Sequence, residues 1–103
     1  MLRIFKILGE SMEPYLRSGD YVVTAKVEAY QSGDAAVIDT VQYGPVVKRI
    51  RTINDEFVML SSDNQNTESD VCCHTHSRSD ILGKVVIKLP LGKYRARFIE
   101  TFH

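Results

Sequence analysis

The sequence lacks the features that mark a membrane protein, a secreted protein or a general nucleic-acid binder. Its 13 Lys and Arg residues balance 13 Asp and Glu residues, so net charge gives no attraction to nucleic acid or to an anionic membrane. No apolar run approaches the ~20 residues that a membrane-spanning helix needs. Arg3 and Lys6 interrupt the apolar stretch in which a secretory signal would begin. We therefore expect no nucleic-acid partner, no membrane association and a cytoplasmic location.

Cysteine is scarce too. Cys72 and Cys73 are the two cysteines and are neighbours in the chain, where an intrachain disulfide would be strained. They are typical of reduced thiols in a reducing compartment. With His74 and His76 they could form a zinc ligand set, but their spacing matches no standard zinc motif. We predict no metal and no cofactor, and keep zinc as the less favoured alternative.

The length of the chain, 103 residues, allows one hydrophobic core and a single domain over residues 1–103. Turn signals recur at short intervals between runs rich in Val, Ile and Tyr, a pattern that predicts many short strands and few helices. The expected strands cover residues 3–8, 21–27, 35–40, 45–53, 56–61 and 81–89. A long polar segment, residues 62–79, is expected to be a surface loop, and residues 63–78 within it are expected to be the least ordered part.

A serine stands at a bend directly after the first expected strand. Ser11 follows Gly9 and precedes Pro14, so its hydroxyl is placed either to cap a short turn or to act as a nucleophile. A capping role is the better interpretation for an isolated serine. The remainder of the chain therefore decides between the two roles.

A lysine in a later strand favours the nucleophilic role of Ser11. With a period of two, Val46, Lys48 and Ile50 share one strand face, which is more apolar than the face that carries two arginines. Burial disfavours the ammonium form, and a neutral lysine can act as general base on a serine hydroxyl. The alternative is that the Lys48 ammonium extends to water at the sheet edge.

Seven segments carry a family resemblance when they are taken in order. They are residues 9–14 (Gly-Glu-Ser-Met-Glu-Pro), 16–20 (Leu-Arg-Ser-Gly-Asp), 33–37 (Gly-Asp-Ala-Ala-Val), 47–50 (Val-Lys-Arg-Ile), 57–60 (Phe-Val-Met-Leu), 62–64 (Ser-Asp-Asn) and 81–85 (Ile-Leu-Gly-Lys-Val). Together they resemble the successive boxes of the Ser/Lys-dyad peptidases, the clan of the type I signal peptidases and the LexA-like self-cleaving repressors. The resemblance covers residues 7 to 87, nearly all of the chain.

The resemblance implies a mainly β fold of coiled, twisted antiparallel sheets, as in the LexA and signal peptidase catalytic domains. It implies a serine peptidase with Ser11 as nucleophile and Lys48 as general base, within hydrogen-bond distance of each other. Backbone N–H groups at Ser11 and at the bend formed by Gly9 and Glu10 would hold the oxyanion.

Family position also implies a pocket for a small aliphatic side chain just before the scissile bond. Its walls would be Ile7, Met12, Leu16 and Val47, for which a plain core role is an equal alternative.

One segment departs from the signal peptidase pattern. There a Gly-Asp-Asn box precedes a stretch whose serine steadies the lysine amine, whereas this chain has Ser-Asp-Asn at residues 62–64 and then Glu68, Ser69 and Asp70. Ser69 would orient the lysine after a one-residue shift, and Asp70 stands where the family has its acid. Glu68 at that place would favour the charged lysine and oppose catalysis.

The predicted function is that of a serine endopeptidase that cleaves a partner protein or peptide in trans after a small aliphatic residue. No anchor is evident, and only ten residues precede Ser11, too few for a self-cleavage site and a DNA-binding segment upstream. The first alternative is a Ser/His/Asp triad with Ser11 and one of the histidines. The second is a non-catalytic partner-binding or dimerisation module that retains the fold. A homodimer through an edge strand is left open.

Overall fold

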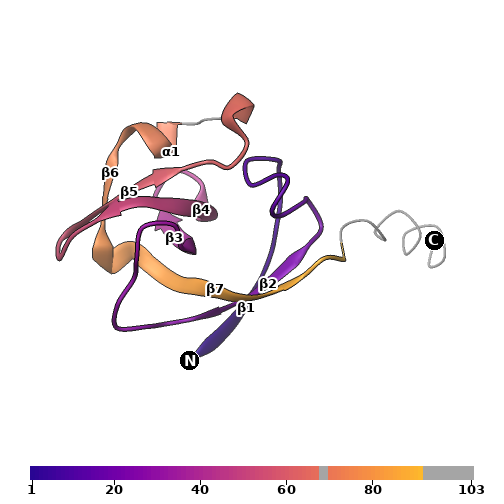
Figure 1. The fold of residues 1–103 in the computed structure, drawn as a ribbon, viewed down its shortest axis with the longest axis horizontal. Coiled ribbons are helices and arrows are strands. Elements are labelled where there is room, and N and C mark those ends of the chain that lie inside the picture. The colour runs from indigo at the N-terminus through magenta and orange to yellow at the C-terminus, as the bar shows by residue number, and fades with distance from the viewer. Residues whose placement is uncertain (68–69, 92–103) are drawn as a thin grey trace.

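The computed structural model describes residues 1–67 and 70–91. Within these residues seven strands form an antiparallel sheet that curls into a half-barrel (Figure 1). The strands are β1 (Leu2–Lys6), β2 (Tyr21–Ala25), β3 (Ala35–Thr40), β4 (Gly44–Ile53), β5 (Phe57–Ser61), β6 (Thr75–Ser77) and β7 (Ile81–Leu89). Their order across the sheet is β1-β2-β7-β3-β4-β5-β6. The prediction of a mainly β fold is confirmed, and no helix of the described residues is long and apolar enough to cross a membrane.

Alternating burial explains why these runs form strands. In β5, Val58 and Leu60 are buried whereas their neighbours are more exposed, which is the period of a sheet with one covered face. Strand β3 differs, because its first four residues are all buried. It lies between β7 and β4 in the middle of the sheet and is covered on both faces.

The core consists of two clusters of buried apolar side chains that meet at β3. One cluster contains Ala36, Ile38, Ile50, Val58, Leu60, Val71 and Ile81. The other contains Ile7, Met12, Leu16, Val22, Ala35 and Val85. Successive residues of a strand point to opposite faces, so Ala35 and Ala36 place the two clusters on opposite sides of β3. The segment around Ser11 packs in the second cluster.

The expectation of a plain surface loop over residues 62–79 is wrong. The described part of this segment contains a 3-10 helix (Gln65–Thr67), helix α1 (Asp70–Cys73), strand β6 and a second 3-10 helix (Arg78–Asp80). Val71 and Cys72 of α1 are buried, and β6 pairs with β5. Two buried side chains and a strand pairing are therefore enough to order a segment that is polar in composition.

Candidate active site

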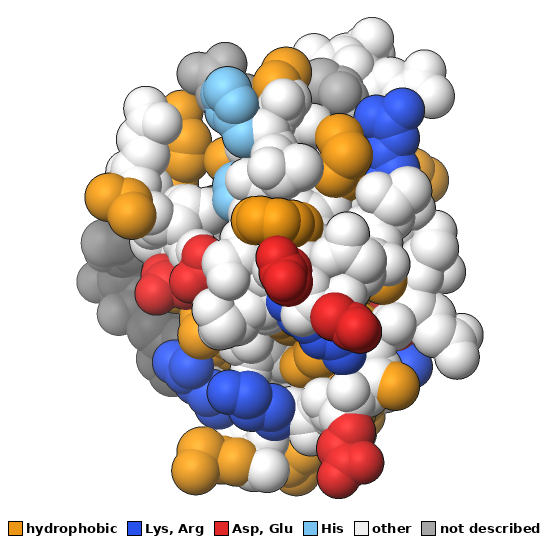
Figure 2. Space-filling model, turned by 90° about the vertical axis from the view of Figure 1, so that its left-hand side faces the viewer, with side chains coloured by type: hydrophobic (Ala, Val, Ile, Leu, Met, Phe, Trp, Pro, Cys, Tyr) orange, Lys and Arg blue, Asp and Glu red, His pale blue; other side chains and the backbone are white. Residues whose placement is uncertain are grey.

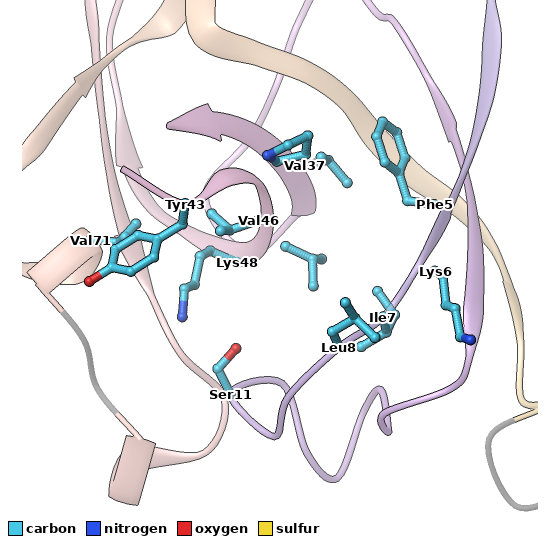
Figure 3. Close-up of a pocket in the computed structure, with 12 residues that line it drawn as sticks. Phe5, Lys6, Ile7, Leu8, Ser11, Val37, Tyr43, Val46, Lys48 and Val71 are labelled. Atoms are coloured by element: carbon cyan, nitrogen blue, oxygen red, sulfur yellow. The ribbon is translucent and has the colours of Figure 1, made fainter. Parts of the chain in front are cut away.

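A cavity of about 330 Å³ opens between the end of β1 and strand β4 (Figure 3). It is lined by Phe5, Lys6, Ile7, Leu8, Ser11, Val37, Tyr43, Pro45, Val46, Val47, Lys48 and Val71. The serine and the lysine that the sequence singles out therefore share one site. They come from different parts of the sheet, since Ser11 lies in the connection between β1 and β2 and Lys48 lies in β4.

Lys48 is a buried residue with a hydroxyl partner. Only 5% of it is exposed, and its Nζ donates a hydrogen bond of 2.9 Å to Ser62 Oγ. Ser62 Oγ in turn lies 3.5 Å from Cys72 Sγ in helix α1. The amine is thus held inside the protein, so the alternative in which it reaches water at the sheet edge is wrong.

Ser11 lies in a tight turn and faces the lysine. The turn begins at Gly9, whose φ of 85° is a left-handed conformation that favours glycine, and the N–H of Glu13 closes it on the carbonyl of Glu10 at 3.1 Å. In Figure 3 the hydroxyl of Ser11 and the amine of Lys48 point toward each other. Among the described residues no hydrogen bond uses Ser11 Oγ, so the hydroxyl does not cap its own turn.

The expected direct hydrogen bond between Ser11 and Lys48 is also absent from the described residues. The one hydrogen bond of the Lys48 amine among the described residues goes to Ser62 instead. Serine and base therefore face each other across the cavity without touching. Catalytic hydrogen bonds are often long in a free enzyme and tighten when substrate binds.

The bend beside Ser11 leaves a backbone donor available. None of the hydrogen bonds of the described residues uses the amide N–H of Ser11. The carbonyl of Glu10 is occupied, since it accepts from Glu13 N and from Asn64 Nδ2. Gly9 and Glu10 thus shape the turn but do not line the cavity, and the N–H of Ser11 is the group suited to an oxyanion.

Two of the four predicted pocket residues line the cavity. Ile7 and Val47 do so, whereas Met12 and Leu16, at 1% and 0% exposure, belong to the core cluster behind Ile7. The pocket prediction is therefore wrong for Met12 and Leu16, whose side chains point into the core. Further wall residues that sequence reasoning missed come from the end of β1 and from the turn before β4.

The partner of the lysine is Ser62, which the sequence reasoning did not assign. Of the two residues expected to orient Lys48, Ser69 lies outside the described residues, and only the backbone of Asp70 is described, at the start of α1. A signal for Ser62 exists in the strand register. Arg49 of β4 pairs with Ser61 of β5, and one step further the antiparallel register places Ser62 opposite Lys48.

The zinc and histidine alternatives receive no support. Cys72 contacts Ser62, and the Nε2 of His76 bonds to the carbonyl of Val71 at 2.7 Å. No group of three or more His, Cys, Asp or Glu side chains among the described residues could hold a metal ion. The histidines His74 and His76 line a different cavity from the one that contains Ser11.

Of the comparisons with known proteins, a family model matches the part of the chain that forms the cavity. A search of the curated proteins finds no match to the chain. A family model described as Peptidase S24-like matches residues 2–86, a span that includes Ser11, Lys48 and Ser62. The match confirms the resemblance to the LexA-like and signal peptidase-like clan that the sequence boxes predicted. The chain belongs to the Peptidase S24-like family.

Proposed function

We propose that the protein is a serine endopeptidase in which Ser11 is the nucleophile and Lys48 is the general base. The observation that carries the proposal is the arrangement in Figure 3, where both polar ends point into one cavity and toward each other. The burial of Lys48 beside Ser11 supports it further, since a lysine amine that shares a cavity with a serine can serve as its general base.

The reaction follows from the groups around the cavity. Lys48 Nζ takes the hydroxyl proton as Ser11 Oγ attacks the peptide carbonyl carbon, and the amide N–H of Ser11 stabilises the negative carbonyl oxygen. The ammonium then returns the proton to the leaving nitrogen as the C–N bond breaks, which leaves an acyl group on Ser11. Lys48 next deprotonates a water molecule, whose oxygen attacks the acyl carbon. The ester C–O bond then breaks, the acid leaves, and the Lys48 ammonium returns its proton to Ser11 Oγ.

Ser62 has a distinct part in this scheme. Its hydroxyl oxygen accepts one N–H of Lys48, so the lone pair of a neutral amine is free to face Ser11. Substrate in the cavity can bring the lysine amine and the serine hydroxyl into contact, since catalytic hydrogen bonds often tighten in the bound complex.

The proposed substrate is a peptide segment of another protein, cut in trans after a small aliphatic residue. The apolar wall formed by Ile7, Val37 and Val47 and the volume of about 330 Å³ support a small apolar side chain at this point. The molecular face in Figure 2 carries acidic and basic side chains close together, which favours a protein partner over nucleic acid. Cys72 and Cys73 are free thiols, which supports a reducing compartment such as the cytoplasm.

A second candidate is a partner-binding module that retains the cavity and does not cut. The observation in its favour is the missing hydrogen bond between Ser11 Oγ and Lys48 Nζ among the described residues. In that case the cavity would hold a peptide side chain, and Ser11 and Lys48 would be polar wall residues.

Incubation with a peptide library, with cuts mapped by mass spectrometry, separates the two functions. The peptidase predicts cuts after small aliphatic residues by the wild type and by Ser18→Ala, an exposed serine in the same connection, and none by Ser11→Ala. Retention of peptides by the wild type without any cut identifies the binding module. Cuts by Ser11→Ala at the wild-type rate contradict the peptidase proposal.

A further inference from the structure

We propose that residues 62–64 act as one positioning element that holds the turn of Ser11 and the strand of Lys48 at a fixed separation; this inference rests on the proposed function. The three residues directly follow β5, and each bonds to a different part of the active site. We call residues 62–64 the positioning segment.

The first tie holds the base. Ser62 accepts the hydrogen bond of 2.9 Å from Lys48 Nζ, and both side chains are buried. A lysine side chain has four rotatable bonds and loses much rotamer freedom when fixed. The hydroxyl of Ser62 therefore selects one position of the amine inside the cavity.

The second tie holds the residue next to the base and reaches the nucleophile turn. Arg49 donates to both carboxylate oxygens of Asp63, at 3.1 Å from Nε and 2.6 Å from Nη2. The guanidinium carbon of Arg49 also lies 4.6 Å from the centre of the Tyr15 ring, a cation–π distance. Lys88 Nζ lies 4.3 Å from the same ring centre and donates to the carbonyl of Tyr15. Asp63 is thus linked through Arg49 to the turn that follows Ser11.

The third tie holds the nucleophile turn directly. The backbone N–H of Asn64 donates to the carbonyl of Ser11 at 2.9 Å, and the Asn64 side-chain amide donates to the carbonyl of Glu10 at 3.2 Å. These two bonds fix the peptide units on both sides of the Ser11 Cα. They therefore set the direction of the Ser11 side chain and of its N–H.

The role is one of positioning, because none of residues 62–64 lines the cavity. A substrate in the cavity contacts the walls, whereas the positioning segment bonds to the Lys48 amine, to Arg49 beside it and to the backbone of the Ser11 turn. Errors of about 1 Å in the placement of such groups can lower a rate by about 10²-fold. Loss of a tie should therefore lower kcat and leave KM nearly unchanged.

Asn64→Asp tests this most sharply. The change keeps side-chain size and keeps the oxygen that accepts from Asn66 N, but it removes the amide donor to Glu10 and places an oxygen against that carbonyl. Asn66→Asp is the matched control, since it adds the same charge at an exposed position two residues away. With a peptide that the wild type cuts, we expect Asn64→Asp to lower kcat at least about tenfold with KM within about twofold. Asn66→Asp should stay within about twofold in both.

A second variant and a structural readout complete the test. Asp63→Asn should also lower kcat, and its combination with Asn64→Asp should lose less than the product of the two losses, because the ties act as a unit. Normal kcat in both single variants, or a loss confined to KM, overturns the inference. Amide hydrogen exchange of Glu13 and Leu16, whose N–H groups close the turn, gives a readout without catalysis.

That readout separates the two proposals. If the wild type cuts no peptide, the proposed function fails, but the positioning segment is still supported when Asn64→Asp accelerates exchange in the turn and Asn66→Asp does not. Equal exchange in the two variants shows that residues 62–64 do not hold the turn.

Discussion

At the scale of single residues, the decisive feature is a lysine enclosed by the fold. An ammonium group carries three N–H donors, and among the described residues the Lys48 amine donates one hydrogen bond, to Ser62. The cavity wall beside it is formed largely by apolar side chains such as Val46, Val47 and Val71. The amine thus has one hydrogen-bond partner in the described part of the chain and an apolar wall beside it, which leaves it room to interact with Ser11 in the same cavity.

Lys48→Arg should abolish cleavage although charge is kept. A guanidinium stays protonated at any accessible pH and cannot accept the serine proton. We expect a loss of about 10³-fold or more in kcat for Lys48→Arg and a comparable loss for Ser11→Ala, measured on a peptide that the wild type cuts. The double variant should lose little beyond either single variant. Full cleavage by Lys48→Arg, or losses that multiply, would show that the two residues do not form a dyad.

The pH profile gives an independent test of the base. Because Lys48 acts only as a neutral amine, the rate should rise with pH into the alkaline range. A histidine base would instead titrate near its ordinary pKa of about 6.5. The measurement is kcat/KM from pH 6 to pH 10, with circular dichroism at each pH as a control for folding. A plateau already reached near pH 7 would point to a histidine.

At this scale the sequence predicted that Ser11 and Lys48 share one site, but it did not predict the hydrogen bond that holds Lys48. Period-two burial correctly placed Lys48 on the apolar face of its strand, because alternation is a local property. The Ser62 partner was missed, since it depends on the register between two strands, which the turn between them sets. Met12 and Leu16 were misassigned because family position does not distinguish a cavity wall from the core directly behind it.

At the scale of elements, the ion pair between Arg49 of β4 and Asp63 of the positioning segment should stay intact over the pH range of an activity assay. The hydrogen-bonded Asp63 carboxylate raises the pKa of Arg49 above its ordinary value. A cation whose pKa is higher in the folded than in the unfolded state stabilises the fold fully at every pH below its unfolded-state pKa. That stabilisation is lost only as the pH rises through the folded-state pKa. This tie therefore persists across the alkaline range in which the proposed lysine base is to be tested.

Gly83 lies where β7 passes close to β2. An added Cβ would lie 2.9 Å from Thr24 Cβ and Oγ1 and 3.2 Å from the carbonyl of Ala25, so strand atoms would have to move. We expect Gly83→Ala to lower the free energy of unfolding by about 1–3 kcal/mol, measured by urea denaturation. Val86→Ala, an exposed position of the same strand, should change it by less than about 0.5 kcal/mol. Equal stability of the two variants would mean that β2 and β7 have room to separate.

The strands were predictable and the short elements after β5 were not. Alternating Val, Ile and Leu residues mark a strand within its own sequence, as the burial of Val58 and Leu60 illustrates. The elements between residues 65 and 80 depend on contacts with distant residues. Val71 and Cys72 are buried in a segment that is otherwise largely polar, and the packing of Val71 in the first core cluster helps to order it.

At the scale of the whole molecule, the two core clusters share the strands of one sheet. We expect them to unfold together, since β3 contributes Ala35 to one cluster and Ala36 to the other. Leu16→Ala and Leu60→Ala, one in each cluster and both fully buried, should each lower the free energy of unfolding by about 2–5 kcal/mol.

Urea unfolding followed by circular dichroism and by tyrosine fluorescence checks this expectation. Both probes should show one coincident transition in the wild type and in each variant. Leu2→Ala, an exposed leucine of β1, is the control and should leave the midpoint nearly unchanged. Two separate transitions would show that the clusters are independent units.

The place of β7 in the sheet has a consequence for how the protein is made. Strands β2 and β3 follow each other in the chain but are not neighbours, and β7 lies between them. While the ribosome is still adding residues, a nascent chain that ends before Ile81 lacks the strand that joins the β1–β2 hairpin to the remaining strands. Until β7 is made, the β1–β2 hairpin, whose connection carries Ser11, has no strand pairing to the part of the sheet that carries Lys48. We therefore expect the complete sheet around the cavity to form only after β7 has left the ribosome.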